Sequence, residues 1–284
     1  MSGNVMQGLV KFSRRFIQTS MNSSNHPDRK RPHRDRPGGR ERRESRPRQA
    51  DNGNDLIFGL HSVTEALNNP RRELVSLQCT LNAKDRLEPA LSTRPDLEAQ
   101  IVHRSQLDRI TGADAVHQGV VLTARPLEQP ELDEIAHDGT IVILDQVTDP
   151  HNVGAIMRSC AAFAVTALVA TTRHSPENSA VMVKSASGAA EHVPFVRVTN
   201  LARAMAQLRD SGVTLIGLDS EASEDISTLD VSPPYAIVLG AEGKGMRRLT
   251  RDNCDHLARL DLPGEIRSLN VSNAAALCLY ALRR

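Results

Sequence analysis

Three short stretches of the sequence place polar residues directly after apolar runs of the kind that form buried strands. The first, LDQVTDPHNVGAIMRS, follows a strand expected at residues 141–144 and leads into a helix that carries Asn152 and Arg158. Asn152 is suited to capping this helix, whereas Arg158 lies among apolar residues and would face the core unless it reached a cleft. Because a guanidinium is permanently charged, Arg158 could hold a phosphate or a developing oxyanion.

The second stretch, IVLGAEGKGMRRL, places a glycine-rich turn between a strand and a helix. It matches neither G-x-x-x-x-G-K-[ST] nor G-x-G-x-x-G, so a phosphate-binding loop is not indicated. Its glycines, which include Gly240 and Gly245, would let the backbone approach a ligand closely, and Glu242 would repel a triphosphate. The turn therefore suits a ligand that is neutral or cationic at this point, and a plain tight turn is the alternative.

The third stretch, RSLNVSNAAALCLY, begins with Ser268, Asn270 and Ser272 and continues as a helix expected at residues 271–282. The helix is apolar nearly all round, a pattern that predicts burial on every side. Serine and asparagine suit a helix N-cap. Because this stretch follows a strand expected in LARLDL, residues 257–262, we expect its polar residues at the same sheet edge as the other two groups.

The order of elements explains how these stretches could be brought together. From residue 140 onward continuous apolar strands alternate with helices, which predicts an α/β fold with a parallel sheet covered on both faces. Residues 55–126 predict a separate small α/β domain, and the polar, acidic segment up to residue 138 predicts a connector. Ligands of parallel sheets bind at the carboxyl ends of the strands, where the three stretches begin.

Residues 1–54 are rich in Arg, Pro and Gly and predict a disordered basic tail. Residues 1–50 carry a net charge of +9 and the remainder −8, a contrast that favours a polyanionic partner such as RNA. The absence of acidic residues from the first 27 also fits an organellar transit peptide, or a true start at Met21.

The composition excludes several other classes of protein. The 4 cysteines form no CxxC pair, so no metal site is expected, and a reducing compartment is the simplest inference. No apolar run approaches the ~18 residues that a bilayer span needs. With 5 Phe, 2 Tyr and no Trp, the chain lacks the aromatic stacking platform of many single-strand binders.

In their order and spacing, the three stretches resemble the motifs of the SpoU (TrmH-like) family of RNA ribose 2′-O-methyltransferases. The motifs are Asn152-x-Gly154-x-x-x-Arg158, Gly240-x-Glu242-x-x-Gly245 and Ser268-Leu269-Asn270-Val271-Ser272. Within that family, GLHSVTEAL and HQGVVLTA are similar to the N-terminal substrate-binding domain of bacterial 23S rRNA guanosine 2′-O-methyltransferases. The resemblance extends over residues 56–284.

The resemblance implies a C-terminal domain, residues 138–284, that is tied into a SPOUT-type trefoil knot, and an N-terminal RNA-binding domain at residues 55–126. It implies S-adenosylmethionine as cofactor, 23S rRNA as substrate, a homodimer and a cytoplasmic location, or an organellar one if the N-terminus is a transit peptide. The family's usual Ile-Pro-Met is replaced here by Leu260-Asp261-Leu262. A tRNA ribose methyltransferase and a non-catalytic RNA-binding assembly factor are the alternatives.

The same resemblance assigns roles to individual residues. Arg158 would stabilise the developing alkoxide, while Asn270 would orient the nucleotide or Arg158, and Glu242 would position Arg158 or Asn152. Main-chain contacts to the cofactor are expected at Gly240, Leu260 and Leu269. The residues expected to bind RNA or to support the structure are Asn152, Ser268 and Ser272.

Overall fold

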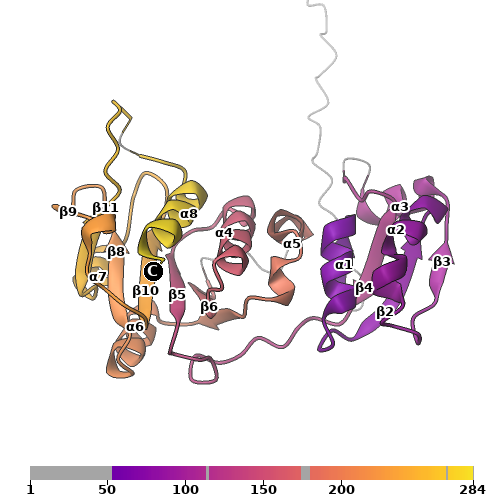
Figure 1. Ribbon diagram of the computed structural model, residues 1–284, viewed down its shortest axis with the longest axis horizontal. Coiled ribbons are helices and arrows are strands. Elements are labelled where there is room, and N and C mark those ends of the chain that lie inside the picture. Colours follow the sequence, from indigo (N-terminus) through magenta and orange to yellow (C-terminus); the bar gives the residue numbers. More distant parts are fainter. Residues whose placement is uncertain (1–52, 113–114, 174–179, 267, 284) are drawn as a thin grey trace, which may run out of the picture. The chain divides into compact units, whose positions relative to one another are not determined.

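The computed structural model describes residues 53–112, 115–173, 180–266 and 268–283. Its strands form two separate sheets, one of four strands and one of seven (Figure 1). We call residues 55–124, which build the smaller sheet and its helices, the N-terminal module, and residues 140–282 the C-terminal module. Residues 1–52 of the predicted basic tail, and with them the alternative transit peptide, lie outside the described residues.

The N-terminal module is a four-stranded sheet with the order β1-β4-β2-β3. Strands β2 and β3 run parallel, and the other neighbours are antiparallel. Apolar residues of α1, including Val63 and Leu67, pack with Leu77 and Leu122 of the sheet into one core. The elements are β1 (Asp55–Phe58), α1 (Leu60–Asn68), β2 (Leu74–Cys79), α2 (Leu81–Leu91), β3 (Ala99–Ile101), α3 (Arg104–Thr111) and β4 (Val120–Ala124).

The C-terminal module is built on a seven-stranded sheet with the order β7-β6-β5-β10-β8-β11-β9, in which all neighbouring strands run parallel. Its strands are β5 (Thr140–Asp145), β6 (Ala167–Thr171), β7 (Phe195–Val198), β8 (Thr214–Leu218), β9 (Glu224–Asp225), β10 (Tyr235–Gly240) and β11 (His256–Arg259). Its helices are α4 (Pro150–Ala162), α5 (Ala180–Ala186), η1 (Ala189–Glu191), α6 (Leu201–Asp210), η2 (Ile226–Thr228), α7 (Arg248–Asp252) and α8 (Val271–Leu282).

Both faces of the larger sheet are buried, because successive side chains of a strand point to opposite faces. Val142 and Leu144 of β5 belong to the core on the face covered by α4 and α8, whereas Ile141 and Ile143 belong to the core under α6. Figure 1 shows α4 and α8 on one side of this sheet and α6 on the other. The predicted parallel sheet with two covered faces is therefore confirmed.

Helix α8 spans the predicted residues, but the prediction that it is buried on every side is wrong for the single chain. Most of its apolar residues pack against the core shared with α4 and β10. Leu277 and Tyr280, however, are 43% and 55% exposed, and the guanidinium of Arg283 lies 3.7 Å from the centre of the Tyr280 ring. One side of α8 thus presents apolar surface to solvent.

The four cysteines are free thiols. Burial raises the pKa of Cys160 and of Cys278 to about 12, so both thiols are protonated and act as small apolar core residues. Among the helices that the structure describes, none combines the length and apolar character needed to traverse a bilayer.

Candidate functional site

The three polar stretches meet at the carboxyl end of the larger sheet, as predicted. They surround a hollow of about 380 Å³, within the size range of small-ligand pockets. The hollow is lined by Gln146, Val147, Thr148, Asp149, Asn152, Ala241, Glu242, Lys244 and Val271. These residues come from the loop after β5, the first turn of α4, the loop after β10 and the start of α8.

The loop after β5 sets the position of Asn152. Gln146 has a φ of 61°, a left-handed conformation that turns the chain sharply as the strand ends. Asp149 is the N-cap of α4, since its side chain accepts a 2.9 Å hydrogen bond from the backbone N–H of His151, and Pro150 opens the helix. The prediction that Asn152 caps α4 is wrong. Asn152 lies in the first turn, where its amide is free to face the hollow.

The glycine-rich stretch forms a tight hairpin that presents Glu242. Ala241 and Gly245 exchange backbone hydrogen bonds of 3.2 and 2.8 Å. A Cβ atom on Gly240 would lie 2.1 Å from the carbonyl carbon of Gly245, so only glycine permits this close approach. The hairpin is thus a tight turn, and its geometry also brings a carboxylate to the edge of the hollow.

A buried carboxylate anchors the far end of this hairpin. Asp145, the last residue of β5, is fully buried and is the register partner of Gly240. It accepts hydrogen bonds of 2.8 Å from both the backbone N–H and the Nε of Arg247, and the Nη2 of Arg247 lies 2.7 Å away. No local pattern in the sequence indicates that Asp145 and Arg247, 102 positions apart, form a pair.

Glu242 collects donors from the other two stretches. One of its oxygens, Oε1, accepts hydrogen bonds from Asn270 Nδ2 at 2.5 Å, from the backbone N–H of Val271 at 3.2 Å and from Asn152 Nδ2 at 3.3 Å. Asn270 Nδ2 also donates to Asn152 Oδ1 at 2.9 Å. The three side chains Asn152, Glu242 and Asn270, which we call the polar triad, are therefore directly connected.

Asn270 also has the capping role that its position predicted. It is the N-cap of α8, and its Oδ1 accepts hydrogen bonds from the backbone N–H of Ser272 at 2.9 Å and from the Ser272 hydroxyl at 2.5 Å. The cap uses the amide oxygen of Asn270, and the polar triad uses the amide nitrogen. One side chain thus fixes the helix start and joins the site.

Arg158 does not belong to the polar triad. It is exposed on α4, and within the described residues it makes no hydrogen bond or ion pair. Glu242 was expected to position either Arg158 or Asn152, and in the structure it contacts Asn152. A contact of Arg158 with Glu242 or with Asn270 is absent from the described part of a single chain.

The residues predicted to contact a cofactor lie outside the lining of the hollow. Gly240 ends β10, and Leu269 is exposed two residues before α8. Leu260 follows β11, which ends at Arg259 rather than continuing to Leu262 as predicted, and Leu260 is packed against the core. Ser268 is exposed in the segment that leads to α8.

The charges around the hollow favour a cationic organic ligand. The carboxylates of Asp149 and Glu242 line it, and Lys244 contributes a positive charge at the hairpin. Within the ranges that the structure covers, no three His, Cys, Asp or Glu side chains come together in a group that could hold a metal ion.

Comparison with known proteins identifies relatives of both modules. Residues 139–280 match the profile of the SpoU rRNA Methylase family, and residues 56–130 match that of RNA 2′-O ribose methyltransferase substrate binding domains. The chain is 41% identical over 237 residues to the 23S rRNA (guanosine-2′-O-)-methyltransferase RlmB of Photobacterium profundum, with 80% of this chain and 96% of the relative covered. It is 40% identical over 238 residues to RlmB of Vibrio parahaemolyticus, with coverage of 80% and 95%.

Among solved structures, the chain is similar to the SpoU methyltransferase AviRb from Streptomyces viridochromogenes in complex with its cofactor AdoMet. The TM-score is 0.68 at 24% sequence identity, with 81% of this chain and 89% of that chain covered. At this level of identity the similarity concerns the fold, and it extends over both modules.

Proposed function

This chain belongs to the SpoU rRNA methylase family, and we propose that it methylates the ribose 2′-oxygen of a guanosine in 23S rRNA. The observation that carries this proposal is the polar triad, because three stretches distant in the sequence meet at one hollow through direct hydrogen bonds. Relatives of about 40% identity that cover 80% of the chain are 23S rRNA guanosine 2′-O-methyltransferases, which supports the choice of RNA and nucleotide.

S-adenosylmethionine is the methyl donor, and the residues present fit it. The hollow of about 380 Å³ is large enough for a small organic ligand, and its two carboxylates, Asp149 and Glu242, suit the cationic groups of this cofactor. Gly240 and Leu269 lie within two residues of Ala241 and Val271, which line the hollow. Their main-chain groups and that of Leu260 are proposed to hold the part of the cofactor that extends beyond the hollow. When bound, the cofactor supplies a methyl group that is already activated by the positive charge of its sulfonium.

Because a ribose hydroxyl is a poor nucleophile, the chain's own residues must orient it and stabilise the alkoxide that develops. We assign the stabilising charge to Arg158, which would also grip a neighbouring phosphate. A guanidinium does not lose its proton in a protein, so Arg158 is not the general base, and the proton of the ribose hydroxyl passes to solvent. Asn270 would orient the nucleotide, and Glu242 would fix the positions of the Asn270 and Asn152 side chains by accepting hydrogen bonds from both.

The remaining predicted residues have supporting roles in this proposal. Ser272 would keep the Asn270 amide fixed through the hydrogen bonds that it donates to Oδ1. Ser268 would support the segment that leads into α8. Asp261, which stands where proline is usual in the family, is proposed to alter the affinity for the cofactor without removing activity.

A homodimer completes this proposal. Leu277 and Tyr280 expose apolar surface on an otherwise packed helix, a feature typical of an interface between copies. Arg158 lies outside the polar triad of its own chain, which supports a site that takes one residue from the partner. The position of β10 supports the proposed trefoil knot, because this strand comes late in the sequence and yet lies between β5 and β8 in the sheet.

The domain boundaries, the cellular location and the role of the basic tail are also part of the proposal. The boundaries are a basic tail at residues 1–54, an RNA-binding domain at 55–126 and the methyltransferase domain at 138–284. The bacterial relatives that act on rRNA support a cytoplasmic location. The tail is proposed to contact the polyanionic backbone of RNA through its net positive charge.

The purified full chain, incubated with radiolabelled S-adenosylmethionine, is expected to label 23S rRNA at one guanosine ribose and to leave tRNA unlabelled. In a strain that lacks the gene, one 2′-O-methyl group should disappear from 23S rRNA, as mapped by resistance to alkaline hydrolysis. Label in tRNA alone would favour the tRNA alternative. If neither RNA gains or loses a methyl group, the enzymatic function is wrong.

A matched pair of glutamate variants tests the site itself. Glu242→Ala removes the acceptor of three hydrogen bonds, and each bond to a charged group contributes about 1.5–3 kcal/mol. We therefore expect the methylation rate to fall by at least about tenfold. Glu221→Ala makes the same chemical change at an exposed position outside the site and should keep the wild-type rate. Equal rates for the two variants would remove Glu242 from the mechanism.

A further inference from the structure

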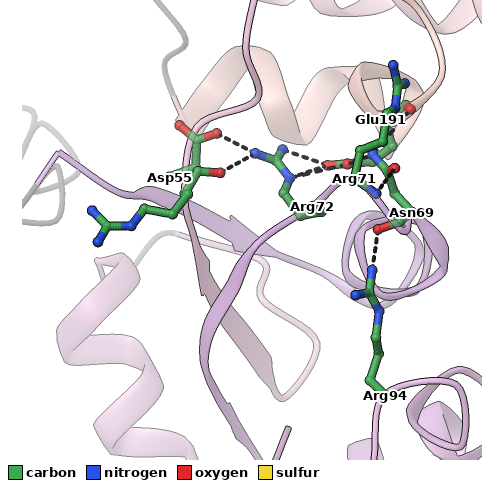
Figure 2. Close-up of polar contacts among 7 residues, drawn as sticks. Asp55, Asn69, Arg71, Arg72, Arg94 and Glu191 are labelled. Carbon is green, nitrogen blue, oxygen red and sulfur yellow. Dashed lines mark hydrogen bonds and ion pairs between the residues drawn. The ribbon is translucent and has the colours of Figure 1, made fainter. Parts of the chain in front are cut away.

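A second connected group of polar residues lies far from the hollow and is centred on Arg72. Arg72 follows α1 in the N-terminal module, and its side chain is 2% exposed. Figure 2 shows its guanidinium between the carboxylates of Asp55 and Glu191. An arginine is almost never this deeply buried unless its charge is paired, so this position requires an explanation.

The two carboxylates come from different modules. Asp55 begins β1 of the N-terminal module, and its Oδ2 lies 2.9 Å from Arg72 Nη1. Glu191 ends η1 of the C-terminal module, and its side chain is 3% exposed. Arg72 donates from Nε and from Nη2 to the carboxylate of Glu191, with the shortest distance, from Nη2 to Oε1, at 2.6 Å. This two-pronged geometry is the strong form of an arginine–carboxylate contact.

Other groups complete the hydrogen bonding of this buried pair. Asn69 Nδ2 donates to Glu191 Oε2 at 2.8 Å, and Arg72 Nη1 donates to the backbone carbonyl of Arg125 at 2.8 Å. Arg94 donates to the backbone carbonyls of Leu67, at 2.7 Å, and of Asn69. The end of α1 is therefore held in the shape that presents both Arg72 and Asn69 to Glu191.

Contacts beside the ion pair join the same two modules. His192 Nε2 lies 2.7 Å from Glu65 Oε2 of α1. Gly188 has a φ of +90°, and a Cβ atom there would lie 2.5 Å from Glu65 Cγ, so the chain before η1 approaches α1 closely. Val183 of α5 packs against the core of the N-terminal module. The ion pair is thus the buried centre of a wider contact.

The segment that receives these contacts is connected to the site by direct packing. Helix α5 lies against α4, and a Cβ atom on Gly154 would come within 2.5 Å of Ser185 Cβ. His151 Nδ1 lies 3.2 Å from the Ser185 hydroxyl. Asn152 of the polar triad is the next residue of α4. The N-terminal module therefore contacts α5 and η1, which pack against α4, the helix that carries Asn152 of the polar triad.

We propose that Arg72 and Glu191 form a docking lock that holds the N-terminal module on the α5–η1 segment and thereby positions bound RNA relative to the polar triad. The positioning of RNA rests on the proposed function, whereas the docking of the N-terminal module through Arg72 and Glu191 does not. Both residues act through the module they hold, so they are positioning residues. If Arg72 is removed, Glu191 is left buried without its cation, which penalises the docked arrangement and favours separation. If Glu191 is removed, Arg72 keeps Asp55 as its only carboxylate partner, so the penalty is smaller.

Hydrogen–deuterium exchange of the full chain tests the lock without any methylation. Arg72→Met should raise exchange in the peptides around residues 69–72 and 188–193, because their amides lose the cover of the other module. Exchange in β5 and β6, which are buried inside the C-terminal sheet, should stay at the wild-type level. Arg71→Met makes the same change at the exposed neighbouring position and should leave all four regions unchanged.

Two further variants separate docking from folding. Glu191→Gln keeps the size of the side chain and removes its charge, so it should produce a weaker form of the same exchange pattern. The double variant Arg72→Met/Glu191→Met removes both charges of the buried pair and leaves Asp55, whose side chain is 14% exposed and reaches solvent. Well-packed apolar pairs can replace a buried ion pair. The exchange of the double variant should therefore return toward wild type. Unchanged exchange in Arg72→Met, or a double variant whose exchange is as high as that of Arg72→Met or higher, would overturn the lock.

Kinetics connect the lock to RNA positioning. Arg72→Met should raise the KM for 23S rRNA by about tenfold, because a loosely tethered module no longer presents RNA at a fixed place. The kcat at saturating RNA and the affinity for S-adenosylmethionine should change less than about twofold, since the polar triad is untouched. A fall in kcat with unchanged KM would contradict the positioning role. A wild-type chain that does not methylate rRNA would instead refute the proposed function while leaving the exchange result standing.

Discussion

At the scale of single residues, Arg247 and Arg248 show how the burial of the carboxylate partner decides how much an ion pair contributes to the free energy of unfolding. Arg247 is the partner of the fully buried Asp145, whereas Arg248 is 94% exposed and lies 3.5 Å from the exposed Asp252. Arg247→Met leaves a buried carboxylate without its cation, which costs about 3–5 kcal/mol in comparable cases. Arg248→Met removes a surface pair that contributes about 0–1 kcal/mol.

We therefore expect Arg247→Met to lower the free energy of unfolding in urea by about 3 kcal/mol or more, and Arg248→Met to change it by less than about 1 kcal/mol. The adjacent positions and identical substitutions make the two variants a matched pair. Similar losses in both would show that Asp145 does not depend on Arg247. Because Arg247 lies two residues after the hairpin that carries Glu242, the methylation rate of Arg247→Met should fall as well.

At the scale of elements, the packing of α4 on α5 depends on one glycine. In Gly154→Ala the new methyl group would meet Ser185 Cβ at 2.5 Å, the Met182 carbonyl at 2.6 Å and the Ala186 nitrogen at 2.9 Å. Two of these atoms are backbone, so α5 must shift, at a cost of about 1–3 kcal/mol. Thermal unfolding should report this loss, and Gly264→Ala, whose methyl group would enter open space, should stay within about 0.5 kcal/mol of wild type. A stable Gly154→Ala would contradict the close helix contact.

The elements were largely predictable because their signals are local. The alternation of apolar strands with helices predicted the parallel sheet, and the Ser and Asn residues before α8 predicted its cap. The third motif was also expected at the edge where the others lie, since the carboxyl ends of parallel strands share one edge. Local patterns could not show that Asp149 rather than Asn152 caps α4, because both residue types make good caps.

What the sequence could not predict depends on contacts between distant residues. Nothing in the local stretch NNPRRELV indicates that Arg72 is buried, and its burial is explained only by the contact with Glu191, 119 positions later in the chain. The same holds for Asp145 and Arg247, which are 102 positions apart. Arg158 was expected to face the core or a cleft because its neighbours are apolar, yet the exposed side of α4 accommodates it. Pairing between distant charges carries no periodic signal in the chain.

At the scale of the whole molecule, the position of Arg158 outside the polar triad makes a prediction about how two chains share a site. In the proposed homodimer, each site combines Glu242 and Asn270 of one chain with Arg158 of its partner. Arg158→Ala and Glu242→Ala should each be inactive alone, and Arg158→Ala should still bind S-adenosylmethionine. When the two inactive proteins are mixed and allowed to exchange subunits, one of the two sites in each mixed dimer contains no substitution.

Random mixing should therefore restore about a quarter of the wild-type activity per chain, because half of the dimers are mixed and each has one intact site. If Arg158 served the site of its own chain, every site in the mixture would carry a substitution and no activity would return. Leu277→Glu provides the second arm, since a charge on the exposed apolar side of α8 should yield monomers by light scattering. Monomers that methylate RNA at the wild-type rate would contradict the shared site, as would a mixture that stays inactive after subunit exchange has been verified.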